Sequence, residues 1–296
     1  MTRVAVIDLG SNSTRLLICE AADGTIEREL LSESIVTRMG EGVDANGAIG
    51  DAAIERVTAV LDGYRRLLAD HEVEQAVALL TSAARDAANG SEVAARAGEA
   101  LGGVEALVID GDEEARLVFR GATLGRDDGG PLAVLDIGGG STELAIGSTG
   151  QVERHGSAQV GVVRHTERHL HHDPPWPEEI AALRADVRAR LGALAGGAQV
   201  EATISVGGTP VSCATMLGHE RADGAVLPAE ACEELLARVV TLSQDELRAL
   251  QGLHPARAPA IVAGIAIHLE ALTVLGAERF EVSERDLRHG AALEFL

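Results

Sequence analysis

The sequence contains no lysine, and all 25 of its basic residues are arginine. This absence excludes a P-loop lysine, a Schiff-base lysine and a lysine nucleophile. Any bound phosphate must therefore be held by arginine, backbone N–H groups, hydroxyl groups or a metal ion. Cysteine is also scarce: Cys19, Cys213 and Cys232 follow no metal-binding spacing. Cys19 and Cys213 lie in apolar runs, where we expect them to be buried as small core residues.

Aromatic residues make up only 2% of the chain, which predicts an aliphatic core. The formal net charge of −21 argues against a nucleic-acid partner bound through a broad basic face. No apolar signal precedes Val4, and no apolar run reaches the roughly 18 residues of a membrane span. We therefore expect a soluble, cytoplasmic protein with no membrane partner, long enough at 296 residues for two domains.

Two stretches 128 positions apart are nearly identical: residues 5–18 and 133–146 agree at eight of fourteen positions. Each is predicted to form a buried strand, a turn with Asp, Gly and Ser/Thr, and a second strand. Glycines allow backbone N–H groups to approach a phosphate closely. The duplication suggests two related domains that hold one phosphorylated ligand between them.

Asp8 and Asp136 each stand at the end of an apolar strand, where a carboxylate is costly unless it is paired or bound to metal. Phosphate nearby favours a shared Mg²⁺, or Mn²⁺, which takes oxygen ligands; a turn-capping Asp is the alternative. The copies differ at Arg15 and Glu143. Arginine suits phosphate, whereas a carboxylate repels it and suits a metal or a water.

Strands and helices alternate in both halves, which indicates an α/β fold. We expect domains over 1–125 and 126–296, joined by a breaker-rich linker at 125–131, and the last helix can cross back to the first domain. Asp51 is expected to cap the first long helix. Expected strands are 4–9, 14–20, 25–37, 75–80, 105–109 and 200–206. Expected helices are 51–70, 91–101, 113–123, 161–171, 177–195, 229–238, 244–252 and 257–276.

Three further motifs are ambiguous by themselves. The loop 205–210 follows a buried strand and contains Gly208 and Thr209, but it could be a plain turn. Arg85 and Asn89 share a face only if their segment is helical. Glu114 stands four residues before Val118, which predicts that it lies at the buried edge of the apolar face of its helix. It is also in the first turn, where the helix dipole alone would favour it. The His-rich tract 165–172 lies in a basic stretch that starts at 154. We interpret the tract as a solvated helix end, in preference to a basic surface that binds a polyanion. A structural zinc site is less favoured, because suitably spaced cysteines are missing.

Together these stretches resemble the exopolyphosphatase / guanosine pentaphosphate phosphohydrolase family. The matching segments, in order along nearly the whole chain, are 7–15, 81–89, 112–117, 136–143, 161–167 with 173–175, and 205–209. The resemblance implies the actin-like ATPase superfold: two ribonuclease-H-like α/β domains with an active site in the interdomain cleft. The chain is similar to the short form, without an appended helical domain. It departs from the family at Asp286 and His289, where Gly and Glu are usual.

The resemblance also implies roles for individual residues. Glu114 would be the catalytic base that orients the attacking water, and Glu143 would support that water or the metal. Asp8 and Asp136 would face the metal and the phosphates. The implied phosphate-binding residues are Asn12, Ser13, Arg15, Arg85, Gly138, Gly139, Gly140 and Ser141, to which we add Gly208 and Thr209.

We therefore expect a Mg²⁺-dependent exopolyphosphatase that hydrolyses the terminal phosphoanhydride of inorganic polyphosphate. The nearest alternative is the same chemistry on guanosine pentaphosphate (pppGpp). A kinase or ATPase of the same superfold and a non-catalytic sensor of alarmone nucleotides stay open as lesser alternatives. A homodimer is also expected, with a contact through aliphatic helical faces near 229–276.

Overall fold

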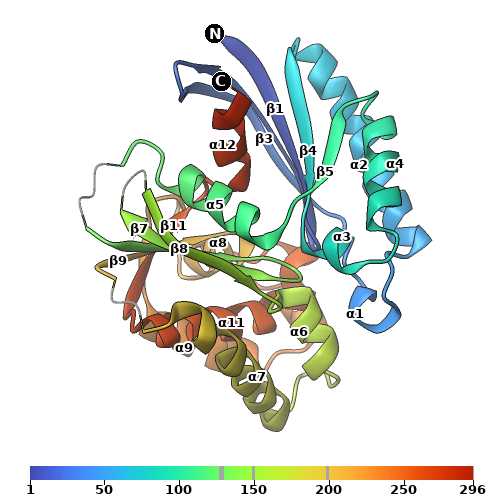
Figure 1. The fold of residues 1–296 in the computed structure, drawn as a ribbon. Helices are drawn as coiled ribbons and strands as arrows, with labels where there is room; N and C mark the ends of the chain where they lie inside the picture. Colours follow the sequence, from blue (N-terminus) through green and yellow to red (C-terminus); the bar gives the residue numbers. More distant parts are fainter. Residues whose placement is uncertain (127–129, 149–150, 198–199, 296) are drawn as a thin grey trace. The chain divides into compact units, whose positions relative to one another are not determined.

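The computed structural model describes residues 1–126, 130–148, 151–197 and 200–295. The chain divides into two compact units. Unit 1 consists of Met1–Leu124 and Arg285–Leu296, and unit 2 consists of Gly125–Glu284. Each unit contains one β-sheet with helices packed on it (Figure 1). The predicted linker at 125–131 falls partly outside the described residues.

Unit 1 is built on a five-stranded sheet of order β3-β2-β1-β4-β5. The first three strands form an antiparallel meander, and β4 and β5 then add parallel to β1. Residues 4–9 of β1 are all buried, which explains their nearly continuous apolar sequence. The strands are β1 (Thr2–Leu9), β2 (Ser13–Ala22), β3 (Thr25–Val36), β4 (Gln75–Leu80) and β5 (Glu105–Val108).

The helices of unit 1 bury aliphatic faces against this sheet. Helix α2 (Asp51–Asp70) directs Ile54, Val57 and Leu61 into the core, at the spacing of an amphipathic helix. The other helices are α1 (Val43–Asn46), α3 (Ser82–Asp86), α4 (Gly90–Ala100), α5 (Gly111–Ala122) and α12 (Leu287–Ala292), followed by the short η2 (Leu293–Phe295). The N-cap of α2 is Gly50, so the prediction that Asp51 caps this helix is wrong.

Two glycines allow α5 and α12 to pack closely. A Cβ at Gly121 of α5 would lie 2.0 Å from the carbonyl oxygen of Asp286, and a Cβ at Gly290 of α12 would lie 1.9 Å from that of Leu117. Any side chain at either position would overlap backbone. The pair therefore fixes the C-terminal helix of the chain against the helix that carries Glu114.

Unit 2 repeats the strand order of unit 1. Its six-stranded sheet has the order β10-β11-β9-β6-β7-β8, in which β6, β7 and β8 form the antiparallel meander and β9 and β11 continue in parallel. The added strand β10 pairs antiparallel with β11. The strands are β6 (Leu132–Ile137), β7 (Thr142–Ser148), β8 (Gln151–Ala158), β9 (Ala202–Val206), β10 (Val226–Pro228) and β11 (Arg279–Ser283).

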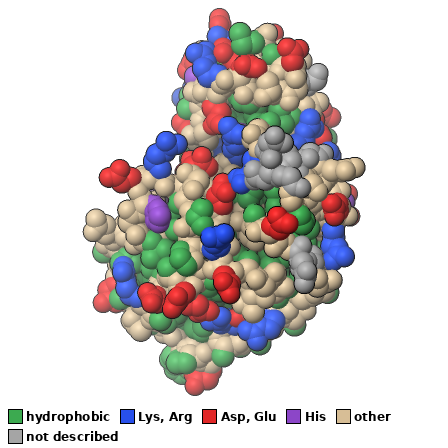
Figure 2. Space-filling model, turned by 90° about the vertical axis from the view of Figure 1, so that its left-hand side faces the viewer, with side chains coloured by type: hydrophobic (Ala, Val, Ile, Leu, Met, Phe, Trp, Pro, Cys, Tyr) green, Lys and Arg blue, Asp and Glu red, His purple; other side chains and the backbone are tan. Residues whose placement is uncertain are grey.

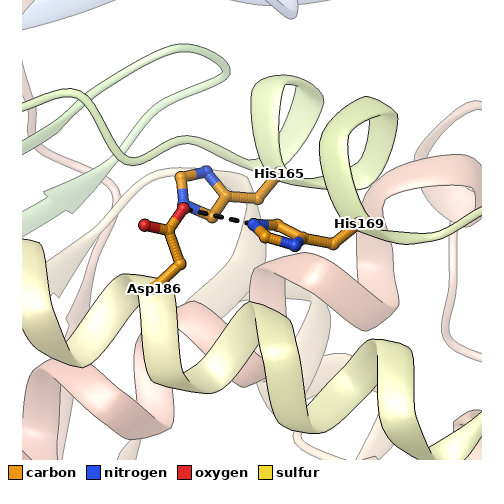
Figure 3. Close-up of side chains that lie close together, drawn as sticks. All are labelled: His165, His169 and Asp186. Atoms are coloured by element: carbon orange, nitrogen blue, oxygen red, sulfur yellow. Dashed lines mark hydrogen bonds and ion pairs between the residues drawn. The ribbon is translucent and has the colours of Figure 1, made fainter.

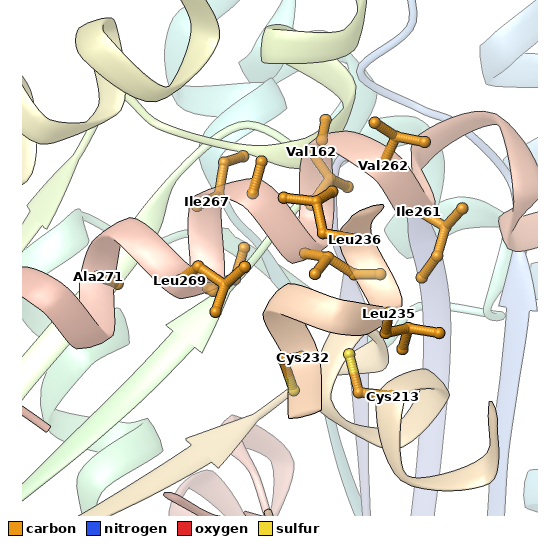
Figure 4. Packing of buried hydrophobic residues seen from close by; sticks show 14 of the residues in the cluster. Val162, Cys213, Cys232, Leu235, Leu236, Ile261, Val262, Ile267, Leu269 and Ala271 are labelled. Carbon is orange, nitrogen blue, oxygen red and sulfur yellow. The ribbon is translucent and has the colours of Figure 1, made fainter. Parts of the chain in front are cut away.

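The core of unit 2 is aliphatic, as predicted, and is centred on helix α11 (Ala258–Leu275) (Figure 4). Cys213 and Cys232 lie in this core as free thiols, and Cys19 is buried in unit 1, as expected of core cysteines. The other helices of unit 2 are α6 (Val162–His169), α7 (Pro177–Ala195), α8 (Gly208–Met216), α9 (Ala229–Val239), α10 (Gln244–Arg248) and η1 (Pro255–Arg257).

The segment Pro255–Leu275 is long and apolar enough to cross a membrane, which corrects the expectation that no run reaches this length. Its apolar window is 78% buried inside unit 2, as in the central helix of a packed domain. The aliphatic side chains of α11 pack in the core of its own unit. The dimer contact near 229–276 stays a prediction.

Most predicted elements are confirmed within one to three residues at their ends, including 25–37, 51–70, 75–80 and 177–195. Several elements were missed. Strand β8 is mostly polar because its side chains are largely exposed, and β10 has only three residues. Helix α8, which begins at Gly208 within the loop 205–210, was not predicted. Strand β11 and helix α12 were not predicted either.

Candidate functional site

The two similar sequences form two similar hairpins. In the first, the Gly10 N–H donates to the Ser13 carbonyl at 3.0 Å; in the second, the Gly138 N–H donates to the Ser141 carbonyl at 2.9 Å. The aspartate next to the last residue of the first strand pairs across each hairpin in the same way. Asp8 is opposite Arg15, and Asp136 is opposite Glu143. The repeat therefore extends from sequence to backbone hydrogen bonding.

The backbone of the first loop is held in place by its neighbours. The Ser11 hydroxyl accepts a hydrogen bond from the Ala83 N–H at 3.1 Å, and the Ser11 carbonyl accepts one from the Gly40 N–H at 2.8 Å. The carbonyl of Asn12 accepts from residues 37 and 38. Asn12 and Ser13, both predicted to bind phosphate, are half-buried at the tip of this fixed loop.

Arg15, predicted to bind phosphate, lies between two carboxylates. Its Nε donates to Asp8 Oδ2 at 2.8 Å, and its Nη1 donates to Asp286 Oδ2 at 2.9 Å. Asp8 is buried, and its Oδ1 has no hydrogen-bond partner. Burial raises the pKa of Asp8, and the lowering effect of the Arg15 charge does not cancel it. One oxygen of Asp8 thus stays available to a cation.

Asp286 belongs to a buried network that the sequence did not reveal. Its carboxylate also accepts from the Arg288 guanidinium at 2.9–3.1 Å, and Arg288 Nη1 donates to the Leu16 carbonyl at 3.0 Å. Burial raises the pKa of Asp286, but Arg288 and Arg15 outweigh burial and hold that pKa well below its ordinary value. The departure at Asp286 was visible in the sequence; its partner Arg15, 271 residues away, was not.

Glu114 and Arg85 lie together. Arg85 Nη1 lies 2.6 Å from Glu114 Oε2 and also donates to the Ile109 carbonyl at 3.0 Å. Glu114 is buried in the first turn of α5, whose N-cap is Asp110. The prediction that Glu114 lies at the buried edge of its helix is confirmed. Asn89, by contrast, caps α4 beyond the end of α3, so it does not share a helical face with Arg85.

The second loop packs against the first turn of α6. The carbonyls of Gly138 and Gly139 accept from the N–H groups of Val162 and Val163 at 3.0 and 2.8 Å. The Gly140 carbonyl accepts from the Arg164 side chain at 2.8 Å. A Cβ at Gly161 would lie 2.4 Å from backbone atoms of this loop. The start of α6 therefore sets the shape of the loop that contains Ser141.

Glu143 and Asp136 are both buried and stand opposite each other on β6 and β7. The Glu143 Oε1 accepts from the Ser157 hydroxyl at 2.7 Å. Two like charges directly opposite each other in a sheet are unfavourable. A cation held by the two carboxylates would relieve this repulsion, so the donor set fits a hard, oxygen-binding metal ion.

The third predicted loop lies close to Asp136 because β9 pairs with β6. A Cβ at Gly207, whose φ is +98°, would lie 3.0 Å from Asp136 Oδ1. Gly208 and Thr209 begin helix α8, and backbone N–H groups at a helix N-terminus favour anions. Arg257 was not predicted: its guanidinium lies where a side chain at Gly208 would be. The sequence signal for this contact is weak: a glycine at position 208 leaves space for another side chain.

The basic stretch 154–172 does not form one face. Arg154 and His155 are exposed on β8, whereas the next members lie on α6. His171 and His172 are exposed, as expected of a solvated tract, but His165 is fully buried, so that interpretation is wrong for it. Over the face shown in Figure 2, acidic and arginine side chains are interspersed.

The model of the Ppx/GppA phosphatase family matches residues 17–296. Exopolyphosphatase 2 of Mycobacterium tuberculosis is 37% identical, over 99% of this chain and 98% of its own. A solved exopolyphosphatase-like protein superposes with a TM-score of 0.91 at 31% identity, covering 99% of this chain and 97% of its own.

A solved exopolyphosphatase from Cytophaga hutchinsonii gives a TM-score of 0.89 at 25% identity and covers 100% of this chain and 99% of its own. The two-sheet α/β fold, with its repeated strand order, is therefore the actin-like ATPase fold of these proteins. With a family match over nearly its whole length, the chain belongs to the Ppx/GppA phosphatase family.

Proposed function

We propose that this protein is an exopolyphosphatase that removes the terminal phosphate of inorganic polyphosphate. The observation that carries the proposal is the buried Glu114 beside Arg85, in a chain 37% identical to an exopolyphosphatase over its full length. A phosphoanhydride has charged oxygens and no group that requires a covalent enzyme intermediate. Its hydrolysis needs positioning and charge neutralisation, which arginines, loop N–H groups and a cation can supply.

In the proposed mechanism, Glu114 accepts a proton from the attacking water. The water oxygen bonds to the terminal phosphorus while the bridging P–O bond breaks. The products are orthophosphate and a chain shorter by one unit. Arg85 holds the Glu114 carboxylate in place and would neutralise charge on the phosphate oxygens. Asn12, Ser13, Arg15, the loop 138–141, Gly208 and Thr209 are the proposed phosphate-binding positions.

We propose Mg²⁺, or Mn²⁺, as the cofactor; its candidate ligands are Asp136 and Glu143 in unit 2 and, in unit 1, the unpartnered oxygen of Asp8. The cation would supply charge neutralisation to phosphate oxygens. The opposed carboxylates of the second hairpin support this assignment. Removal of divalent ions with EDTA should abolish phosphate release, and added Mg²⁺ should restore it. Full activity in EDTA would contradict the assignment.

The partners we propose are anionic phosphate compounds and not nucleic acid. The net charge of −21 and the mixed charges seen in Figure 2 support this. A second copy of the chain is a further proposed partner. Three free, buried cysteines suit a reducing cytoplasm, which is the location we propose.

The substrate is tested by measuring phosphate release with Mg²⁺ from long polyphosphate, short polyphosphate, guanosine pentaphosphate and ATP in parallel. We expect release from polyphosphate without any acceptor. Release from guanosine pentaphosphate alone would transfer the proposal to that substrate. Binding without release from any of the four would indicate a sensor.

A further inference from the structure

Two histidines and an aspartate converge in unit 2. His165 and His169 stand one turn apart on α6, and Asp186 faces them from α7 (Figure 3). One potential ligand atom from each residue lies within 4.8 Å of the others. The sequence argued against zinc because suitably spaced cysteines are missing, but it could not show that Asp186 completes a set with two histidines.

The positions of the side-chain atoms suit a metal. His165 is fully buried; its Nε2 lies 3.4 Å from Asp186 Oδ2 but makes no hydrogen bond. His169 Nε2 lies 3.1 Å from the same oxygen. Both imidazoles therefore place a nitrogen close to the same carboxylate oxygen.

Two arginines also contact Asp186. Arg190 donates to Oδ1 at 2.7 Å and leaves Oδ2 directed at the imidazoles. Arg168 Nη1 lies 3.5 Å from Oδ2, and its side chain is 30% exposed. A site with two imidazoles and one carboxylate favours borderline metals such as Zn²⁺ over Mg²⁺, which prefers oxygen ligands and keeps its waters.

We propose that His165, His169 and Asp186 bind a transition-metal dication of the zinc class, at a site separate from the one proposed for the phosphates. Three protein ligands leave a fourth position of a tetrahedral site for water. The bound ion would join α6 to α7. This inference does not depend on which phosphate compound the enzyme hydrolyses.

The ion would also act on the phosphate loop. At present His165 Nδ1 accepts a hydrogen bond from the Gly161 N–H at 3.3 Å. A neutral ring bound to metal through Nε2 carries its proton on Nδ1, which then cannot accept. Gly161 packs directly on the backbone of Gly139 and Gly140. Loss of this hydrogen bond is therefore expected to move the residue that supports the loop.

Calorimetric titration of the full chain with ZnCl₂, in phosphate-free buffer with excess MgCl₂ to occupy the oxygen-ligand site proposed above, tests the site. We expect one ion to bind per chain. His169→Ala and Asp186→Asn should each weaken zinc binding at least about 10-fold. Removing a residue that only hydrogen-bonds a metal ligand already lowers metal affinity by about 10–100-fold, so removing a ligand should cost no less. Arg168→Gln should strengthen binding, because it removes a competing positive charge.

His171→Ala is the matched control, because it removes an exposed histidine of the same tract and should leave binding unchanged. Circular dichroism of each variant in EDTA checks that it is folded. The absence of zinc binding to the wild type would overturn the site. So would a zinc affinity in His169→Ala and Asp186→Asn that equals the wild-type affinity. A Gly161 amide NMR signal that does not move at zinc saturation would overturn the coupling to the loop.

Discussion

Replacement of Asp286 by alanine should strongly destabilise unit 1. The carboxylate is buried and is shared by Arg15 and Arg288, whose side chains are 21% and 6% exposed. Arg15 keeps Asp8 as a partner in the variant, but Arg288 loses its carboxylate. Removal of one partner of a buried ion pair typically costs about 3–5 kcal/mol of unfolding free energy, because the other charge stays buried and unpaired.

Urea unfolding measures this loss. Tyr64 is the single tyrosine and belongs to unit 1, and Trp176 is the single tryptophan and belongs to unit 2, so their signals follow the two units separately. With a urea m-value of about 1–3 kcal/mol/M, a loss of about 3–5 kcal/mol should lower the Tyr64 midpoint by roughly 1–5 M. The Trp176 signal serves as the internal reference.

Two further variants separate the causes. Asp286→Asn keeps a hydrogen-bond acceptor at the N-cap of α12 but removes the negative charge. The decrease in its free energy of unfolding therefore reports the ion pair alone. Asp62→Ala removes an exposed carboxylate 3.9 Å from Arg65 and should change the free energy of unfolding by less than about 1 kcal/mol. A loss below about 1 kcal/mol for Asp286→Ala would refute the reasoning that this network stabilises unit 1.

Two other predictions follow. Gly161→Ala places a Cβ 2.4 Å from the Gly139 backbone. It should lower kcat for phosphate release at least about 10-fold, because it displaces the phosphate loop. Gly192→Ala is the control: the space around Gly192 is open, so this variant should keep wild-type activity in the same assay. Because the folded-state pKa of Asp286 is depressed, its stabilisation is present above its unfolded pKa of about 3.9 and is lost as pH falls through the folded value. The stability difference between wild type and Asp286→Ala, measured by urea titration, should therefore persist from pH 7 to 5 and shrink in stronger acid; a constant difference down to pH 2 would contradict the assigned charge.

The sequence predicts the parts of the fold and site that depend on local pattern. The repeated hairpin, the buried edge position of Glu114 and the long amphipathic helices could all be predicted, because their residues are close in sequence and their periodicity is strong. The polar strand β8 and the glycine-led helix α8 lack such a pattern, so they were missed.

Contacts between distant segments could not be predicted. Arg15 is predicted to bind phosphate, but the sequence did not indicate its contact with Asp286. Helix α12 places Asp286 there through the close approach of Gly121 and Gly290. For the same reason, the sequence did not predict that Asp186 lies beside the histidines of α6. A single sequence contains no spacing rule that links such residues, because tertiary packing determines which ones meet.

The central claim is that Glu114 activates the water that hydrolyses polyphosphate. The most direct measurement is phosphate release from polyphosphate with Mg²⁺ by Glu114→Gln beside wild type, with Glu113→Gln as control, because Glu113 is its neighbour in the same helical turn and pairs with Arg116. We predict a loss in kcat of about 10²–10⁴-fold for Glu114→Gln and little change for Glu113→Gln. Wild-type kcat in Glu114→Gln would contradict the account.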